Sequence, residues 1–234
     1  FAKPEEITLF CYGSLKDTRY IPLLGHELMQ MDQFLGALGQ PVGIKTYIPY
    51  HSDGEDNLYD FLGMCGVPCD PVAIFPQEPC TVLLTASSAC DPDVLARVRE
   101  HLTAGNDAAF TAGFVRVMQD RGLEEFTAMR LPGTTMRGNH FGAFEGCWDA
   151  AVRYNYSGKE IGMPVADWKV NDCDYKAAMY SESMPNPLVT YNDYGDGRAY
   201  FINIPDDFAD IYWLPDTVLD KYRMHQSRAL PVRI

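Results

Sequence analysis

The sequence predicts an α/β fold built on a mostly parallel β-sheet. Through the first two-thirds of the chain, short apolar runs alternate with segments of helical period, which is typical of βα units. One of these segments is a well-capped helix between two buried runs. The chain has 234 residues, of which 47% are hydrophobic and 22% charged, so it is long enough to bury a large core.

The clearest of these units occupies residues 81–111. An apolar run over 81–86 leads to Asp91, a helix-capping residue, and to Pro92, which suits the first helical position. A glycine turn then ends the helix, and residues 108–111 resume as an apolar run. The predicted buried stripe of this helix consists of Val94, Leu95, Val98 and Leu102. The pattern predicts a right-handed βαβ crossover.

Two further helices are predicted before this unit, together with strands at 7–12, 42–50 and 72–75. The first helix, over residues 20–38, has one apolar face made of Leu24, Leu28, Met31 and Leu35. The second has a stripe made of Leu58, Phe61, Leu62 and Cys65. We expect its N-cap to be Asp53, followed by first-turn acids that favour the helix dipole, Glu55 and Asp56.

The last third has a different pattern. Residues 143–183 are rich in Tyr, Val and Trp, which favours extended or antiparallel strands. Residues 194–198 form a predicted tight turn between strands at 188–191 and 199–204, and a closing helix follows at 214–222. The chain is therefore predicted to be one domain over 1–234, with 143–187 as a strand-rich insertion.

Charge and hydropathy exclude several classes of protein. The formal net charge is -13, from 32 acidic and 19 basic residues, which argues against a nucleic-acid partner. No apolar run approaches the roughly 18 residues that a membrane span needs. The sequence starts at Phe1 without a basic region and an apolar core, so a targeting signal would have to lie upstream.

The cysteines indicate reduced thiols. Their number is odd, and the spacing of Cys65 and Cys69, which suits a disulfide or half a metal site, has no second pair to complete it. We therefore expect no metal or cofactor and a reducing, cytoplasmic compartment. The seven cysteines are Cys11, Cys65, Cys69, Cys80, Cys90, Cys147 and Cys173.

Three segments carry a resemblance to a known family: 55–70, 81–107 and 195–203. They resemble class I glutamine-amidotransferase-like domains, and especially the trimerisation-type accessory domain of bacterial β-galactosidases. The resemblance covers most of 42–118 and 188–208. It implies a flavodoxin-like three-layer sandwich and a role in assembly, as a homo-oligomer or beside other domains of a parent enzyme, in a carbohydrate-related protein.

The catalytic residues that the resemblance implies are missing from this chain. An amidotransferase of this class needs a Cys on a sharp strand-to-helix turn, but Thr111 and Ala112 stand at that place. It also carries a His in a His-Pro-Glu-like pattern near the last strand, but the matching residues here are Ile204, Pro205 and Asp206. We therefore expect a domain without amidotransferase activity.

A ligand-binding cleft is expected where the parallel strands end, because open α/β sheets bind ligands at that edge. A small-molecule sensor that uses this cleft is one alternative function. The candidate residues for the cleft are Tyr12, His51, Ser87, Thr111 and Asp206.

A second alternative is a hydrolase or amidotransferase with a relocated nucleophile. Cys90 stands between a predicted strand and a predicted helix, where a helix N-terminus would lower the pKa of a thiol, and His51 or His140 could serve as its base. The favoured interpretation of Cys90 is a small packed residue. His101 is expected to be an exposed helical side chain.

Two further groups have both a structural and a functional interpretation. Asp53, Glu55 and Asp56 could chelate a hard cation, although acids in a first helical turn are common for dipole reasons alone. The aromatic residues of the last third could stack on sugar rings or form a subunit interface, but packing of an antiparallel sheet is favoured. These are Tyr154, Tyr156, Trp168, Tyr175, Tyr180, Tyr191, Tyr194 and Trp213.

Overall fold

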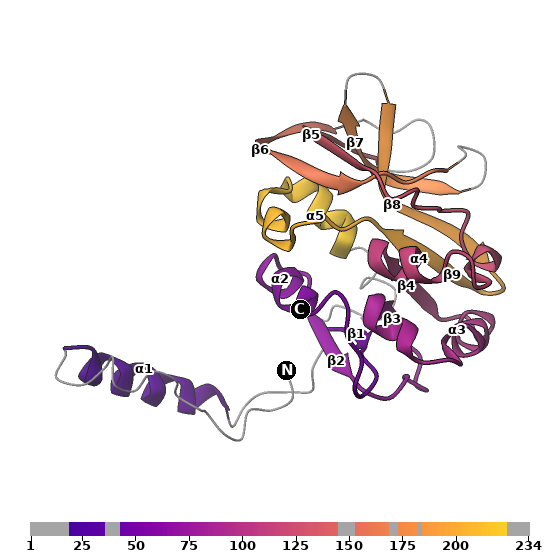
Figure 1. Ribbon diagram of the computed structural model, residues 1–234. Helices are drawn as coiled ribbons and strands as arrows, with labels where there is room; N and C mark the ends of the chain where they lie inside the picture. The colour runs from indigo at the N-terminus through magenta and orange to yellow at the C-terminus, as the bar shows by residue number, and fades with distance from the viewer. Residues whose placement is uncertain (1–18, 36–42, 145–152, 169–172, 182–183, 224–234) are drawn as a thin grey trace. The chain divides into compact units, whose positions relative to one another are not determined.

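The computed structural model describes residues 19–35, 43–144, 153–168, 173–181 and 184–223 (Figure 1). Contacts between residues divide the chain into two compact units, 1–42 and 43–234. The prediction of one domain over 1–234, with 143–187 as an insertion, stays a prediction. The predicted strand at 7–12 lies outside the described residues, as do Cys11, Tyr12 and Cys147.

The described part of the first unit is the helix α1 (Tyr20–Leu35), which confirms the predicted helix over these residues, and residues 36–38 of the prediction lie outside the described ones. Leu24 and Leu28 are half-buried, whereas Tyr20, Ile21 and Leu23 are exposed. None of the helices in the described residues is long and apolar enough to cross a membrane.

The second unit contains a single sheet of nine strands in the order β2-β1-β3-β4-β9-β8-β7-β5-β6. Five neighbouring strands are parallel: β2 (Cys69–Val72), β1 (Ile44–Tyr47), β3 (Thr81–Leu84), β4 (Asp107–Thr111) and β9 (Gly197–Ile202). The other four continue the sheet with antiparallel pairings: β8 (Met184–Tyr194), β7 (Asp174–Ser181), β5 (Thr135–Ala143) and β6 (Arg153–Pro164).

The predicted fold class is therefore wrong. A mostly parallel, flavodoxin-like three-layer sandwich does not describe a mixed sheet in which half of the described pairings are antiparallel. The physical reason is the hairpin of β8 and β9, in which Tyr194 pairs with Gly197 across a two-residue turn. The predicted turn is confirmed. Because β9 also pairs in parallel with β4, this hairpin joins the antiparallel, Tyr-rich strands to the parallel half of the sheet.

Two hydrophobic clusters, one on each face of the sheet, form the core. Along β3, Leu83 belongs to one cluster and Val82 and Leu84 to the other, as the alternation of side chains in a strand requires. One cluster includes residues of α2 (Leu58–Met64), η4 (Phe208–Trp213) and α5 (Asp216–Arg223). The other includes residues of α3 (Val94–Thr103), α4 (Ala112–Met118) and η3 (Leu123–Glu125).

The predicted βαβ crossover is confirmed as β3, α3 and the parallel strand β4. The helix begins at Val94, two residues later than expected. Asp91 precedes it and accepts hydrogen bonds from the Asp93 amide at 2.9 Å, the Tyr47 hydroxyl at 2.8 Å and Arg97 at 3.0 Å. Asp91 therefore ties the start of this helix to the strand β1.

Three local predictions are wrong. The helix α2 starts at Leu58, and Asn57 at its N-cap has left-handed backbone and makes no side-chain cap, so Asp53 is not the cap. The predicted strand 72–75 lies earlier, as β2. His101 is buried, with Nε2 3.0 Å from the Cys80 carbonyl oxygen, and burial lowers its pKa.

The antiparallel half curls so that its edge strand meets the segment after β9. The Asp206 amide donates to the Gly162 carbonyl at 3.2 Å, and the Asn203 side chain donates to the Pro164 carbonyl at 2.8 Å. The Tyr222 hydroxyl of α5 donates to the Asn203 carbonyl at 2.6 Å. Figure 1 shows α5 beneath the strands β5 and β6, which agrees with the cluster that they share.

Most of the Tyr-rich residues pack as the favoured interpretation expects. Trp168 and Tyr175 lie 5.4 Å apart between ring centroids, and Tyr194 packs on Phe126 at 5.0 Å. Tyr156 and Trp213 differ, with 70% and 50% of their surfaces exposed. The side chain of Tyr154 lies outside the described residues.

Candidate functional site at the strand-to-helix junctions

Two adjacent parallel strands, β3 and β4, end at the same edge of the sheet, and each leads into a helix through a threonine. Thr85 precedes η2 (Ala86–Cys90), and its amide donates to Ser88 Oγ at 3.0 Å. Thr111 ends β4, and its hydroxyl caps α4 by accepting from the Phe114 amide at 3.2 Å. The sequence places threonines here because a hydroxyl can accept from the free amides of a first helical turn.

The carboxylate of Glu55 lies between these two junctions. Its Oε2 accepts from the Ala86 amide at 2.7 Å and from the Thr111 hydroxyl in a short hydrogen bond. Its Oε1 accepts from the Gly113 amide at 3.1 Å. One side chain therefore satisfies donors from η2, β4 and α4 together.

An unusual backbone brings Glu55 to this place. His51, Glu55 and Asn57 have φ of 61°, 53° and 62°, in the left-handed region that residues other than glycine rarely adopt. Gly54, with φ of 113°, passes so close to η2 that an added Cβ would lie 2.9 Å from the Ala86 Cβ. The loop 51–57 thus turns repeatedly before α2 starts, and Glu55 is not in the first turn of that helix.

Gly113 is the complementary feature on α4. A Cβ at this position would lie 2.2 Å from the Glu55 Cδ and within 2.6 Å of both carboxylate oxygens. No side chain can therefore coexist there with Glu55 in its observed place. Gly113 also supplies one of the amides that the carboxylate binds.

Burial raises the pKa of Glu55 above its usual value of 4.5. The hydrogen bonds from Thr111, Ala86 and Gly113 act in the opposite direction, as does the charge of Arg116 on α4, but desolvation outweighs them. Arg116 also lies 3.6 Å from a carboxylate oxygen of Asp206.

The structure brings some of the predicted cleft residues together. Thr111 is fully buried against Glu55, and Ser87 is buried in η2, where its hydroxyl shares a 2.8 Å hydrogen bond with that of Thr85. Asp206 is exposed, accepts from the Thr135 hydroxyl at 2.6 Å and reaches α4 through Arg116. Their role as ligand-binding residues stays a prediction.

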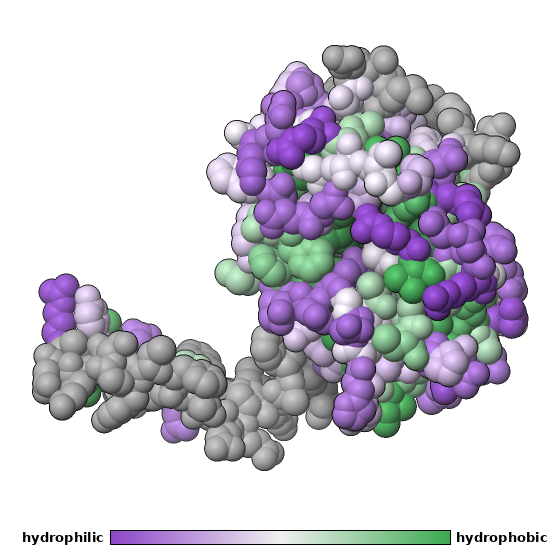
Figure 2. Space-filling view, viewed as in Figure 1, coloured by the Kyte–Doolittle hydropathy of each residue, from purple (hydrophilic) through white to green (hydrophobic). Residues whose placement is uncertain are grey.

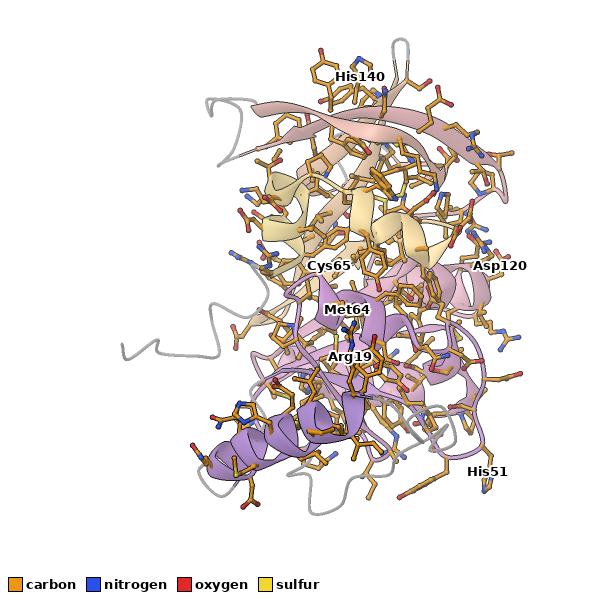
Figure 3. The ribbon with its side chains drawn as sticks, turned by 90° about the vertical axis from the view of Figure 1, so that its left-hand side faces the viewer. Arg19, His51, Met64, Cys65, Asp120 and His140 are labelled. Carbon is orange, nitrogen blue, oxygen red and sulfur yellow. The ribbon has the colours of Figure 1, made fainter. Side chains whose placement is uncertain are left out.

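The two histidines considered as bases lie far from each other. Figure 3 labels His51 and His140 at opposite ends of the second unit, with His51 pointing outward. His140 packs on Tyr156, with ring centroids 4.5 Å apart. Within the described residues, no hydrogen bond joins either histidine to Cys90.

Cys90 is an exposed free thiol at the last residue of η2, four residues before α3 starts. The favoured interpretation of Cys90 as a packed residue is therefore wrong, and Cys90 does not lie in the first turn of α3 either. Three further cysteines are also free thiols: Cys65, Cys69 and Cys80. Burial raises the pKa of Cys69 to about 11, so this thiol is poorly suited to nucleophilic chemistry.

In the part of the chain that the structure describes, no three His, Cys, Asp or Glu side chains are grouped so that they could hold a metal ion. The acids at Asp53, Glu55 and Asp56 do not form such a group, because the Glu55 carboxylate turns toward the junctions.

Sequence reasoning missed the role of Glu55. Its partners at Thr111 and Gly113 lie 56 and 58 residues further along the chain, so no local pattern connects them. The sequence offers one local signal, the turn-forming Ser52-Asp53-Gly54 before a short helix, and this pattern predicts a helix cap instead.

A family model described as "Uncharacterized protein SSO3021, second domain" matches residues 39–207. This chain belongs to that family. The match spans the loop that carries Glu55, both junctions and the strands β1 to β9. No curated protein matches the chain.

Solved structures agree with the chain in fold. The cold-adapted β-galactosidase from Rahnella sp. R3 superposes with a TM-score of 0.52 at 13% sequence identity, over 92% of this chain and 36% of that enzyme. The cytoplasmic protein STM1381 from Salmonella typhimurium LT2 superposes with a TM-score of 0.50 at 11% identity, over 75% of this chain and 87% of that protein. The chain thus spans about a third of the galactosidase and most of STM1381.

We expect the substitutions Glu55→Ala and Gly113→Ala to be strongly coupled. Gly113→Ala alone should lower the free energy of unfolding by about 1–3 kcal/mol, because its methyl group overlaps the Glu55 carboxylate. Glu55→Ala alone leaves two amides without their acceptor, which costs about 1–3 kcal/mol. In the double variant the overlap is gone, so the measured loss should be smaller than the sum by at least about 0.5 kcal/mol.

Urea denaturation of the four proteins measures this coupling. Additive losses would mean that Glu55 does not occupy the space in front of Gly113.

The stability contribution of Glu55 should depend on pH. Because its pKa is raised in the folded state, that state retains the proton at pH values where the unfolded chain has released it. The contribution is therefore full below pH 4.5 and is lost as the pH rises through the folded-state pKa. The difference in unfolding free energy between the unaltered chain and Glu55→Gln should fall as the pH rises above 4.5, measured by urea denaturation. A difference that grows with pH would mean that the hydrogen bonds outweigh burial.

Proposed function

We propose that this chain is a non-catalytic, amidotransferase-like domain that serves assembly within a larger, carbohydrate-related protein. The observation that carries the proposal is the junction at Thr111, where the carboxylate of the half-buried Glu55 binds the groups that a nucleophile would need.

The junction lacks an available nucleophile. The Thr111 hydroxyl is fully buried, donates to Glu55 and accepts from the Phe114 amide, and the next residue, Ala112, has no reactive atom. An acyl-transfer enzyme needs a nucleophile that substrate can reach.

Two amides of the junction that could otherwise bind an oxyanion are already engaged. The amides of Ala86 and Gly113 both donate to Glu55, so neither is available to a reaction intermediate. When ionised, the carboxylate would repel the negative charge that develops in acyl transfer. Acyl transfer at this junction is thus disfavoured by the presence of the Glu55 carboxylate as well as by the missing cysteine and histidine.

The position that the resemblance assigns to a histidine base holds an aliphatic residue. Ile204 is 2% exposed and packs in the hydrophobic cluster with α5. Asp206, two residues later, faces Thr135 and Arg116. The acid that remains in this short segment, Asp206, is thus engaged by a hydroxyl and a guanidinium, and no histidine stands beside it.

The assembly role is supported by the likeness to one part of a β-galactosidase. Similarity over only 36% of that enzyme fits a domain that accompanies others. The resemblance to the trimerisation-type accessory domain adds the expectation of contacts between copies or with a parent enzyme, and of a link to carbohydrate.

Thiol labelling tests the absence of catalysis, since Cys90 is the remaining nucleophile candidate. We expect iodoacetamide at neutral pH to label Cys90 in the folded chain no faster than in the urea-unfolded chain, because it is merely an exposed thiol. Peptide mapping by mass spectrometry gives both rates. Selective labelling about tenfold faster in the folded chain would favour the relocated-nucleophile enzyme instead.

Mass measurement in solution tests assembly. We expect light scattering on a sizing column to give a mass above that of one chain, 26.3 kDa, and to rise with concentration if association is weak. A strict monomer at every soluble concentration would remove self-assembly from the proposal and leave only association with other domains.

A further inference from the structure

The loop 51–57 is fastened to the ends of the parallel strands through one side chain. Among the described residues, every hydrogen bond that joins this loop to a residue outside 49–61 is made by the Glu55 carboxylate. The other hydrogen bonds of the loop are local, such as those from the Ser52 amide and hydroxyl to the Pro49 carbonyl. Release of this one carboxylate would therefore free the loop from both strand-to-helix junctions.

The backbone of the loop is in an unfavourable conformation while this contact is made. His51, Glu55 and Asn57 have left-handed φ angles, which L-residues other than glycine rarely adopt. A loop released from the junctions can return to the right-handed or extended regions. The conformation of the backbone thus favours opening, and the contact of Glu55 opposes it.

The loop is polar, so its opening would expose little apolar surface. Residues 51–57 read His-Ser-Asp-Gly-Glu-Asp-Asn and include no aliphatic side chain. His51, at the start of the loop, points outward in Figure 3. Hydrophilic residues also separate the hydrophobic areas on the face of the second unit shown in Figure 2. A segment with few buried apolar contacts can open locally while the core stays folded.

Few charged groups act on the Glu55 carboxylate. Arg116 of α4 favours its ionised form, and Asp206 lies beyond Arg116, 3.6 Å from the guanidinium. Toward the carboxylate, the ends of β3 and β4 and the start of η2 present amides and hydroxyls. The remaining ionisable side chains of these elements are either exposed or at the far end of their element: His51, Asp53, Asp56, Cys90 and Asp107.

We propose that the loop 51–57 is a pH-sensitive latch, closed over the ends of β3 and β4 while Glu55 holds a proton and open after Glu55 has lost it. Opening frees the amides of Ala86 and Gly113 from their acceptor. It also uncovers the Thr111 hydroxyl, which is fully buried in the closed state.

The direction of the switch follows from the burial of the carboxylate. Desolvation outweighs the hydrogen bonds and the charge of Arg116, so the pKa of Glu55 in the closed loop lies above its usual value of 4.5. In the open loop the carboxyl group is in water and has an ordinary pKa. Because the closed loop binds the proton more tightly, closure is favoured at low pH and weakens as the pH rises through the closed-state pKa.

Hydrogen exchange of single amides, followed by NMR spectroscopy of the full chain, tests the latch. The Ala86 and Gly113 amides donate to Glu55, so their protection from exchange measures closure. After correction for the intrinsic exchange rate, which itself rises with pH, their protection should fall at least about threefold between about pH 5 and about pH 8.

Two neighbouring amides are internal controls. The Thr85 amide donates to Ser88 Oγ and the Phe114 amide to Thr111 Oγ1, and neither hydroxyl titrates in this range. Their protection should stay constant while that of Ala86 and Gly113 falls.

A pair of matched variants assigns the titration. Glu55→Gln keeps the size of the side chain but has no proton to lose, so it should remove the pH dependence at Ala86 and Gly113. Glu100→Gln makes the same change at an exposed position of α3 and should leave the pH dependence as it is.

Two results would overturn the proposal. Protection of Ala86 and Gly113 that stays constant or rises with pH in the unaltered chain would mean that Glu55 does not leave the junctions. An equal loss at Thr85 and Phe114 would mean that the junctions unfold together and that the loop is no separate latch. All parts of the latch lie in the second unit of one chain, so a strict monomer in the mass measurement would contradict self-assembly without affecting this proposal.

Discussion

The carboxylate of Glu55 fastens the loop 51–57 to the ends of two neighbouring parallel strands. It accepts hydrogen bonds from Ala86, Thr111 and Gly113, which belong to the ends of two neighbouring strands and the starts of two helices. Two features of the backbone make this contact possible. The left-handed residues of the loop 51–57 turn Glu55 toward the strand ends, and Gly113 leaves room for its carboxylate. A buried carboxylate is tolerated because three donors satisfy it.

The hydrogen bonds of Glu55 also limit which ligands and which reactions the carboxyl-terminal edge of the parallel strands can support. In open α/β sheets this edge is where ligands and catalytic groups usually lie. Here the donors that could bind an anionic group are occupied from within, and the hydroxyl of Thr111 is enclosed. Together with the aliphatic Ile204, these occupied groups are the basis on which a structural role is proposed.

The second half of the sheet changes which surfaces the domain presents. The hairpin of β8 and β9 adds four antiparallel strands to the parallel ones, and the edge strand β6 bends back to meet the segment after β9 through Asp206 and Asn203. This curl packs α5 against the sheet and sets η4 beside α2. The contact between α2 and η4 is a consequence, since it joins segments about 150 positions apart, such as those of Met64 and Tyr212.

The sequence by itself determined several local features and the residue types at the strand-to-helix turn. The apolar stripe of α3, the tight turn before β9 and the residues Thr111 and Ala112 could all be identified, because periodicity, caps and turn residues act within a few positions. Only the tertiary structure decided the strand order of the sheet, the burial of His101 and the partners of Glu55. These depend on contacts between segments that are distant in the chain, where a single sequence contains no signal of which strand pairs with which or which side chain fills a space. Glu55, expected at the start of its own helix, instead binds at the start of another, because the backbone turns after His51 and directs it there.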